Sequence, residues 1–382
     1  MSNSSQVFES LIGGRKLRLE TGKLAEQANA AVTVQYGETV VLVTTCASKE
    51  PRQGIDFLPL TVDYEERLYA AGKIPGGWFK REGRPSEDAT LAARLTDRPL
   101  RPLFPKGLRN DIQVVATVLS TDRENDPDIL SIIGASAALV ISDIPFTSPV
   151  AATRIGMLDG HLVVNPTFTE RNESALDLVV AGTRDAVMMV EAGASELPEA
   201  TMLEAIRLAQ ETNRQIVEMQ ERMVAELGKP KFEAPKVGPS DEAVKAVQTE
   251  LGGRLGEALF RSNKAERVAA LDALRKEVKE RLQETYPATE IEEAFESILK
   301  KEMRARILER GIRADGRGLK EVRPIWCEVG SLPRTHGSGL FNRGQTQVLT
   351  IVTLGSPGEE QRFDSITPEE HKRFLHHYHM PP

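Results

Sequence analysis

Cysteine is scarce in this chain: only Cys46 and Cys327 occur among its 382 residues. They form no CxxC pair and no metal-binding spacing, so the sequence predicts neither a disulfide framework nor a zinc site. Two isolated thiols are typical of a reducing compartment, and we expect a cytoplasmic protein. No apolar run approaches the roughly 20 residues of a membrane helix. The first residues also lack the basic and apolar regions of a signal peptide.

An excess of basic residues is also missing, because the net charge is −7 at pH 7. This argues against a protein coated in cations for unspecific binding of DNA. It permits a local basic channel, since a potential depends on where the charges lie. The length allows two or three domains at roughly 100–200 residues each.

Residues 1–230 read as a first domain of strands and helices. The β-branched runs 31–36 and 39–45 flank Gly37-Glu38, which predicts a two-residue hairpin turn. Residues 57–62 predict a further strand that lies at a sheet edge or ends at Pro59. Capping and apolar patterns predict helices at residues 86–98, 130–141 and 199–227.

Residues 231–310 form a second region, entered through a Pro- and Lys-containing linker at 229–240. Residues 241–310 carry 14 basic and 15 acidic residues and three aromatic residues. This composition predicts an all-helical module of mixed charge. Because its charges nearly cancel, a solvated spacer between domains is the favoured interpretation over direct contact with a charged ligand.

An internal repeat begins in residues 311–382. The segment Gly37–Leu42 (GETVVL) resembles Gly344–Leu349 (GQTQVL), at an offset of 307 residues. Such a long period predicts a duplicated domain rather than a solenoid. A complete second copy would need about 155 more residues than the chain supplies. We therefore expect 311–382 to be the incomplete start of the second copy.

The loop 76–86 (GGWFKREGRPS) is the motif best suited to nucleic acid. Aromatic faces stack on bases, and lysine and arginine follow phosphates. From Trp78 to Arg109 the chain has eight basic and four acidic residues, in a protein that is acidic overall. Arg94 and Arg98 lie four residues apart and share one face of the predicted helix. The alternative is an exposed loop with solvated charges.

The acidic candidates for catalysis are weaker. Asp126 and Asp128 precede an apolar helix whose N-terminus would otherwise suit an anion, and both would repel it, so the turn is interpreted as structural. Asp177 is a lone carboxylate on a strand, whereas metal-assisted phosphoryl chemistry generally uses a second one nearby. His377 and His379 would share a face of a strand, but no cysteine accompanies them. No metal ligand is therefore assigned.

Several segments together resemble the bacterial polynucleotide phosphorylases (polyribonucleotide nucleotidyltransferases). They are GGWFKREGRPSE, the following RLTDRPLRPLFP and IGASAAL, the line RADGRGLKEVRPI, and the repeat. The resemblance covers essentially the whole chain. It implies an α+β fold: an RNase PH-like core (ribosomal protein S5 domain 2-like) at 1–230, an all-helical domain at 231–310, and a partial second RNase PH-like core at 311–382.

The resemblance also implies where RNA and the chemistry belong. In that family the loop matching 76–86 lines the entrance of a channel within a homotrimeric ring. On this basis we predict contacts with single-stranded RNA at Phe79, Lys80, Arg81, Arg84, Arg94 and Arg98. The family's catalytic pattern has a serine-rich turn, two aspartates six residues apart and a lysine two residues after the second. Here Asp126-Pro127-Asp128, Arg171 and Val179 depart from it, and only Asp177 fits.

The first core is therefore expected to be catalytically degenerate, with no catalytic residue in this chain and the catalytic groups beyond Pro382. The implied function of the complete protein is processive 3′→5′ phosphorolysis of RNA in mRNA degradation, releasing nucleoside diphosphates. Inorganic phosphate would be the co-substrate, and Mg²⁺ or Mn²⁺ would bind in the missing part of the second core. Proteins of an RNA-degradation complex are further possible partners, and no membrane is expected. The alternative is an inactive fragment that binds RNA and assembles the ring.

Overall fold

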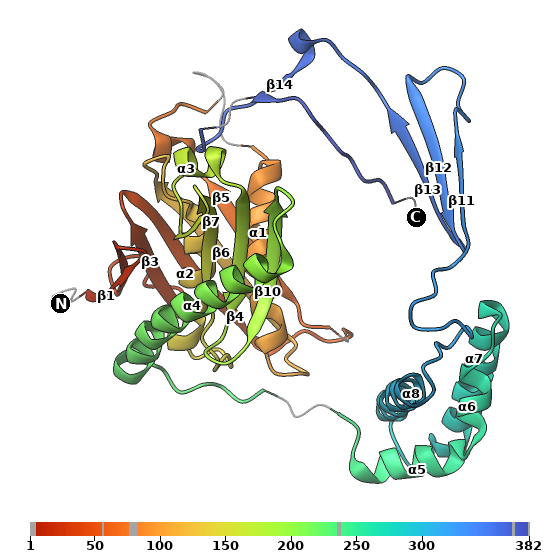
Figure 1. The fold of residues 1–382 in the computed structure, drawn as a ribbon. Coiled ribbons are helices and arrows are strands. Elements are labelled where there is room, and N and C mark those ends of the chain that lie inside the picture. The colour runs from red at the N-terminus through yellow and green to blue at the C-terminus, as the bar shows by residue number, and fades with distance from the viewer. Residues whose placement is uncertain (1–4, 56, 76–82, 235–237, 369–370, 381–382) are drawn as a thin grey trace. The chain divides into compact units, whose positions relative to one another are not determined.

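A computed structural model of the chain describes residues 5–55, 57–75, 83–234, 238–368 and 371–380. Its contacts divide the chain into two compact units, each treated by itself below. Unit 1 comprises residues 1–235 and 361–382, and unit 2 comprises residues 236–360. Figure 1 shows both units and labels most of their helices and strands. None of the described helices combines the length and apolar character needed to cross a bilayer.

The larger sheet of unit 1 has six strands. In their order across the sheet they are β1 (Gln6–Ile12), β2 (Arg15–Thr21), β3 (Ala30–Tyr36), β4 (Thr39–Pro51), β6 (Asn110–Ser120) and β5 (Leu60–Glu66). Neighbouring strands are antiparallel except β5 and β6, which are parallel. Gly37 adopts φ +61° in the turn between β3 and β4, as the predicted hairpin requires. The strand expected at a sheet edge is β5, although it begins later than the predicted residue 57.

A second sheet and four helices complete this unit. The sheet has the order β10 (Val187–Ala194), β9 (Leu176–Gly182), β7 (Ala151–Leu158) and β8 (His161–Val164). The helices are α1 (Glu87–Leu100), α2 (Pro127–Ile141), α3 (Phe168–Glu173) and α4 (Glu199–Leu227). Short 3₁₀ turns lie at Leu68–Ala71 and Arg101–Leu103.

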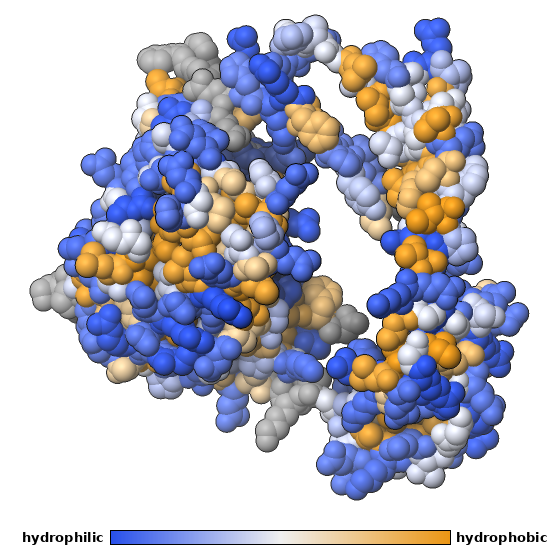
Figure 2. Space-filling model, in the orientation of Figure 1, coloured by the Kyte–Doolittle hydropathy of each residue, from blue (hydrophilic) through white to orange (hydrophobic). Residues whose placement is uncertain are grey.

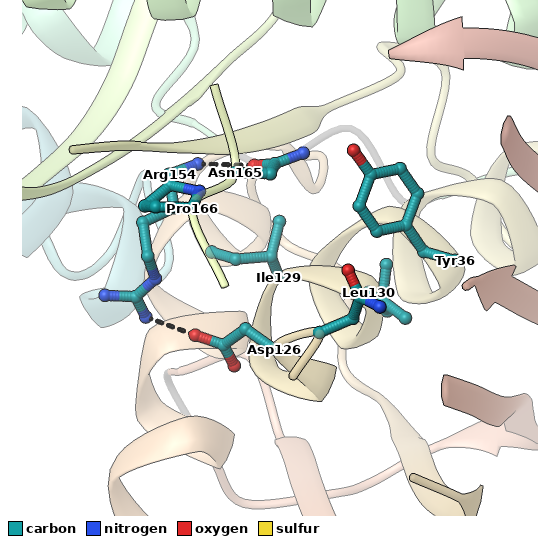
Figure 3. Close-up of a pocket in the computed structure, with 8 residues that line it drawn as sticks. Tyr36, Asp126, Ile129, Leu130, Arg154, Asn165 and Pro166 are labelled. Carbon is teal, nitrogen blue, oxygen red and sulfur yellow. Dashed lines mark hydrogen bonds and ion pairs between the residues drawn. The ribbon is translucent and has the colours of Figure 1, made fainter. Parts of the chain in front are cut away.

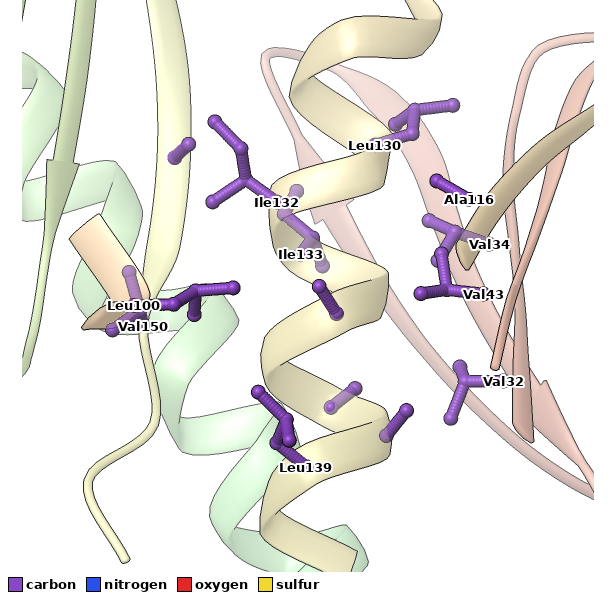
Figure 4. Close-up of a cluster of buried hydrophobic side chains, with 14 of the residues drawn as sticks. Val32, Val34, Val43, Leu100, Ala116, Leu130, Ile132, Ile133, Leu139 and Val150 are labelled. Atoms are coloured by element: carbon purple, nitrogen blue, oxygen red, sulfur yellow. The ribbon is translucent and has the colours of Figure 1, made fainter. Parts of the chain in front are cut away.

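Helix α2 forms the centre of the core. It packs on β3 and β4 of the six-stranded sheet and on α1, β7 and α4. Figure 4 shows Val34 and Val43 on one side of it and Leu100 and Val150 on another. Every residue from Ile129 to Ile141 is buried, which explains why this segment is apolar without a polar face. It begins three residues before the predicted start, because Asp126 caps it and proline is favoured in the first helical turn.

The start of the predicted linker is attached to the C-terminal end of α2. The Lys231 ammonium donates hydrogen bonds to the carbonyl oxygens of Leu139, Val140 and Ser142, at 3.0, 2.7 and 2.6 Å. The Phe232 backbone N–H donates to the Asp143 carbonyl oxygen at 2.8 Å, and the Phe232 ring packs on the core. A cation at this position satisfies carbonyl groups that helix geometry leaves unpaired.

A segment near the C-terminus also packs on unit 1. Ile366 is buried in the core of this unit, with 1% of its surface exposed. Arg123 donates a hydrogen bond to the Thr367 carbonyl oxygen at 2.9 Å, and Lys73 donates to that of Ser365 at 3.1 Å. The short strands β14 (Gln361–Arg362) and β15 (His371–Lys372) pair around this segment.

Unit 2 joins a helical module to a small sheet. Its elements are α5 (Asp241–Leu251), α6 (Arg254–Leu259), α7 (Lys264–Leu282), α8 (Ala288–Arg310), β11 (Ile325–Val329), β12 (Gly337–Arg343), β13 (Thr346–Val352) and a 3₁₀ turn at Pro357–Glu359. The module has its own core, centred on Val247, Val278 and Phe295. Its helices are as the composition of 241–310 predicts.

The β12–β13 hairpin repeats the geometry of β3–β4. Arg343 pairs with Thr346 across a two-residue turn, as Tyr36 pairs with Thr39, and Gly344 has φ +63°. In unit 1 the equivalent strands are covered by α2. The β11–β13 sheet instead exposes apolar side chains, visible as orange patches in Figure 2, and these include Trp326, Leu349 and Ile351. The repeat read from the sequence is thus present in the backbone.

Candidate functional site

The predicted RNA-contact residues divide between described and undescribed parts of the chain. Phe79, Lys80 and Arg81 lie outside the described residues. Arg84 is exposed two residues before Ser86, the N-cap of α1. The Ser86 hydroxyl accepts a hydrogen bond from the Ala89 backbone N–H at 2.9 Å and donates one to the Glu66 carboxylate at 2.6 Å. The end of the predicted loop is therefore fixed between β5 and α1.

Arg94 and Arg98 both lie on the exposed side of α1, while Ala92, Leu95 and Pro99 face the core. Arg98 forms an ion pair with Glu191 of β10, at 2.5 Å. That carboxylate competes with a phosphate for the guanidinium group. The contribution of Arg98 to RNA binding is thus expected to be smaller than that of Arg94.

Four charged side chains meet where α2, α3, β7 and β9 converge, and we call them the four-charge network: Asp126, Arg154, Arg171 and Asp177. Arg154 pairs with Asp126 at 2.7 Å and also contacts Asp177. Arg171 pairs with Asp126 at 3.1 Å and with Asp177 at 3.0 Å. Figure 3 shows Arg154 directed at Asp126. Each arginine thus bridges both carboxylates, and the four charges sum to zero.

The network lies largely shielded from solvent, so losing one of its charges would cost much of the folding free energy. The side chains of Arg154 and Asp126 are only 8% and 9% exposed. Burial by itself would raise the pKa of Asp177, but the guanidinium groups of Arg154 and Arg171 outweigh it and hold this pKa below its usual value. Burial opposes the charge on Arg154, and Asp126 and Asp177 more than restore it, raising its pKa. The pairing thus favours the charged forms of Arg154 and Asp177.

The network explains the acidic residues that the sequence singled out. Asp126 is the N-cap of α2, and its carboxylate accepts a hydrogen bond from the Asp128 backbone N–H at 2.9 Å. A carboxylate therefore occupies the end of α2 where an anion would bind, as predicted. Arg171 was identified only as the residue that replaces an expected aspartate. Arg154 was missed, because nothing in the sequence around it marks a charged site.

Little space remains for a substrate beside the network. A cavity of about 10 Å³ is lined by Tyr36, Asn125, Asp126, Arg154 and Asn165, among others. This is room for about one water molecule. The Arg154 Nε is buried there without a hydrogen-bond partner among the described residues. A phosphate group or a nucleotide does not fit in such a space.

The described residues also contain no group of three or more His, Cys, Asp or Glu side chains placed to hold a metal ion. The two carboxylates of the network are neutralised by arginines, so they do not fit a divalent cation. His377 and His379 stack with ring centroids 6.4 Å apart, but the segment that carries them is not a strand. The expectation that they share a strand face is wrong.

Asp128 lies beside the network and differs from it. Burial first, and then the neighbouring Asp126 carboxylate, raise the pKa of Asp128 to about 8. Tyr64 packs nearby with a buried hydroxyl, and burial raises the pKa of that hydroxyl well above its usual value. Asp128 is therefore mostly protonated at neutral pH.

We expect Asp128→Asn to stabilise unit 1 at high pH. Because the folded pKa of Asp128 is raised, the unfolded chain releases this proton first, and the wild type loses stability as pH rises from about 4 to about 8. Asparagine mimics the protonated acid and removes this loss. The variant should match the wild type near pH 4 and exceed it by several kcal/mol near pH 8 in urea unfolding, since each pH unit between the two pKa values costs the wild type about 1.4 kcal/mol. A constant difference across this range would contradict the assignment.

Three family profiles match successive parts of the chain. The profile of the 3′ exoribonuclease family, domain 1, matches residues 13–145 and 321–382, and the profile of domain 2 matches residues 148–212. Residues 242–318 match a profile described as "Polyribonucleotide nucleotidyltransferase, RNA binding domain". The same domain 1 profile covers both segments that carry the internal repeat. The predicted α+β fold of RNase PH-like cores with a helical domain is confirmed.

The similar relatives are named polyribonucleotide nucleotidyltransferase. The protein of Roseiflexus castenholzii is 56% identical over 380 residues, which cover 97% of this chain and 51% of the relative. The protein of Natranaerobius thermophilus is 55% identical over 383 residues, covering 97% of this chain and 53% of the relative. The chain spans about half the length of these relatives. Among solved structures, rice (Oryza sativa) Rrp46 matches at a TM-score of 0.44 with 13% identity, over 58% of this chain and 95% of that one.

Proposed function

Since the chain belongs to the 3′ exoribonuclease family, we propose that it is the RNA-holding part of a polyribonucleotide nucleotidyltransferase. The whole protein would shorten single-stranded RNA from its 3′ end in the cytoplasm, as part of mRNA degradation. The four-charge network carries this division of labour, because it fills the first core's site with paired charges. Unit 1 is thereby left to bind RNA and to assemble a homotrimer.

The reaction proposed for the whole protein is phosphorolysis. An oxygen of inorganic phosphate attacks the phosphorus of the last internucleotide linkage. The bond from that phosphorus to the 3′ oxygen of the preceding nucleotide breaks, releasing a nucleoside diphosphate and an RNA with a new 3′ hydroxyl. Such chemistry depends on positioning and on offsetting negative charge, which a Mg²⁺ or Mn²⁺ ion supplies when bound. The residues of the first core do not fit that ion, so no step is assigned to them.

The predicted contacts with RNA are retained in this proposal. Phe79 would stack on a base, while Lys80, Arg81, Arg84 and Arg94 would follow the phosphates. Arg98 would contribute less, because Glu191 pairs with it. The exposed position of Arg84 and Arg94 supports their part in such a surface.

In this proposal the helical module also contributes to RNA binding. Its overall charge balance favours a spacer, but residues 242–318 match a family profile that is described as RNA-binding. We therefore assign a share of RNA binding to this module. The domain limits at 230 and 310 stay a prediction.

Two measurements on this chain test the proposal. The first is phosphate-dependent release of nucleoside diphosphates from poly(A) in the presence of Mg²⁺, for which we expect no product. The second is binding of single-stranded RNA by the wild type and by Lys80→Ala/Arg81→Ala, which should bind roughly tenfold more weakly, since two phosphate contacts are lost. A double variant of unit 1 outside the proposed RNA contacts, Lys16→Ala/Lys23→Ala, removes the same charge from exposed residues and serves as the control. Clear phosphorolysis by this chain would refute a degenerate first core.

A further inference from the structure

The helical module is nearly neutral as a whole, but its charges are unevenly distributed. Residues 241–299 carry nine basic and thirteen acidic residues, whereas residues 300–310 carry five basic and two acidic residues. The second half of α8 is thus a basic segment attached to an acidic one. Charge balance over the whole module conceals this difference, and it is local charge that attracts a ligand.

Helix geometry sorts the charges of α8 further. At 3.6 residues per turn, Lys300, Lys301 and Arg304 lie within about 100° of the helix circumference. We call these three residues the basic strip. Glu302 and Glu309 lie roughly 180–200° from Lys300, on the side where Ile291 and Phe295 pack into the module. All three side chains of the basic strip are exposed.

Three of the six cations of α7 form ion pairs among the described residues, against one of the five cations of α8. On α7, Arg275 pairs with Glu292 at 2.8 Å and also contacts Glu296, while Arg281 pairs with Glu250 at 2.9 Å and with Glu277 at 2.8 Å. On α8, Arg306 pairs with Glu302 at 2.5 Å. None of the three residues of the basic strip has an ion pair within the part of the chain that the structure describes.

Two ordinary reasons for cations on a helix do not account for this arrangement. Cations near a helix C-terminus interact favourably with its dipole, but that effect is confined to the last turn, and Arg304 lies six residues before Arg310. Lysine and arginine also cover apolar surface with their stems, yet the basic strip faces away from the packed side. Like charges at positions i and i+4 instead destabilise a helix slightly. Lys300 and Arg304 have this spacing.

We propose that Lys300, Lys301 and Arg304 form a contact surface for the phosphate backbone of single-stranded RNA. This inference rests on the RNA binding proposed for the helical module and names its location. Three cations on adjacent turns of one rigid helix neutralise successive phosphates without reading bases. The surface thus holds RNA of any sequence.

The test compares two triple variants of the whole chain. Lys300→Gln/Lys301→Gln/Arg304→Gln removes the basic strip, and glutamine retains a similar helix propensity. Arg254→Gln/Lys276→Gln/Arg281→Gln removes the same charge from residues that are paired with Glu277, Glu280 and Glu250. Fluorescence anisotropy of a labelled oligoadenylate gives the affinity over a range of salt concentrations. Circular dichroism confirms that both variants fold.

We expect the first variant to bind RNA roughly tenfold more weakly and the second to bind within about twofold of the wild type. The slope of log affinity against log salt should fall by about 2 in the first variant, since each lost phosphate contact removes about 0.7. If both variants weakened RNA binding equally, net charge rather than the position of the basic strip would determine the affinity, and the inference would be overturned. Loss of binding to phosphatidylserine vesicles with unchanged RNA binding would overturn it in favour of a lipid surface.

The RNA affinity of the basic-strip variant is tested independently of the loop variant, Lys80→Ala/Arg81→Ala. A Lys80→Ala/Arg81→Ala chain that binds RNA normally, beside a weakened basic-strip variant, would reject the loop contacts and retain the basic strip. The opposite pair of results would reject the basic strip alone.

Discussion

Replacing Arg154 with methionine is expected to lower the free energy of unfolding of unit 1 by about 3–5 kcal/mol. The reason is that Asp126, which is 9% exposed, would keep its charge with Arg171 as its one remaining partner in the network. Removing one partner of a buried ion pair costs this much because a buried charge loses its compensation. Hydrogen exchange of the β7 and β9 amides in rising urea reports this stability for unit 1 separately from unit 2.

A double variant distinguishes charge from shape. Arg154→Met/Asp126→Asn again balances the network, with Arg171 facing Asp177, and asparagine retains the cap of α2. We expect it to recover more than half of the loss. An Arg154→Met chain within about 1 kcal/mol of the wild type would show instead that water screens these charges as it does at a surface.

Substituting Gly134 with valine should be about as damaging, through packing rather than charge. A Cβ atom at Gly134 would lie 2.6 Å from Val43 Cγ2 and 2.7 Å from Val34 Cγ2. Neither methyl group has room to retreat, since both valines are fully buried. Overpacking generally costs 1–3 kcal/mol, and valine adds two further methyl groups, so we expect a loss of about 3 kcal/mol or more by thermal unfolding.

The matched variants test the geometric cause. Gly134→Ala should cost less, because alanine adds a single methyl group and favours a helix by about 1 kcal/mol. Combining it with Val43→Ala removes the nearer methyl group and should cost less than the two separate losses added together. If the losses of stability of the two single variants simply added, α2 would accommodate the new methyl group by moving away from the sheet.

The sequence predicted most of the local structure of unit 1. Gly37 indicated the β3–β4 hairpin, because a two-residue turn requires positive φ. Ser86 indicated the start of α1, because its hydroxyl accepts a backbone hydrogen bond. The repeat predicted the β12–β13 hairpin through Gly344. These signals act within a few residues, so they can be read along the chain.

The candidate site was less accessible to prediction. Asp126 and Arg171 drew attention as departures from a family pattern, and Asp177 as the one residue that fits it. Nothing in the sequence indicated that these residues neutralise one another. Arg154 is remote in sequence from Asp126 and Asp177, and only the packing of α2 between the sheets brings them together. The basic strip was hidden for a different reason. The net charge of the whole module does not show on which face of a helix each charged residue lies.

The attachment of Lys231 to α2 has a mechanical consequence. A force on the chain beyond residue 234 first reaches the hydrogen bond from Phe232 to the Asp143 carbonyl oxygen. It then reaches the Lys231 contacts with the carbonyl groups of Leu139, Val140 and Ser142, before the end of α4. Helix α2 has 15 residues and is about 22 Å long, with the four-charge network at its other end. A buried helix with fully packed sides moves as a rigid rod. A pull on the linker is thus applied to the C-terminal end of the same helix whose N-terminal end is capped by Asp126.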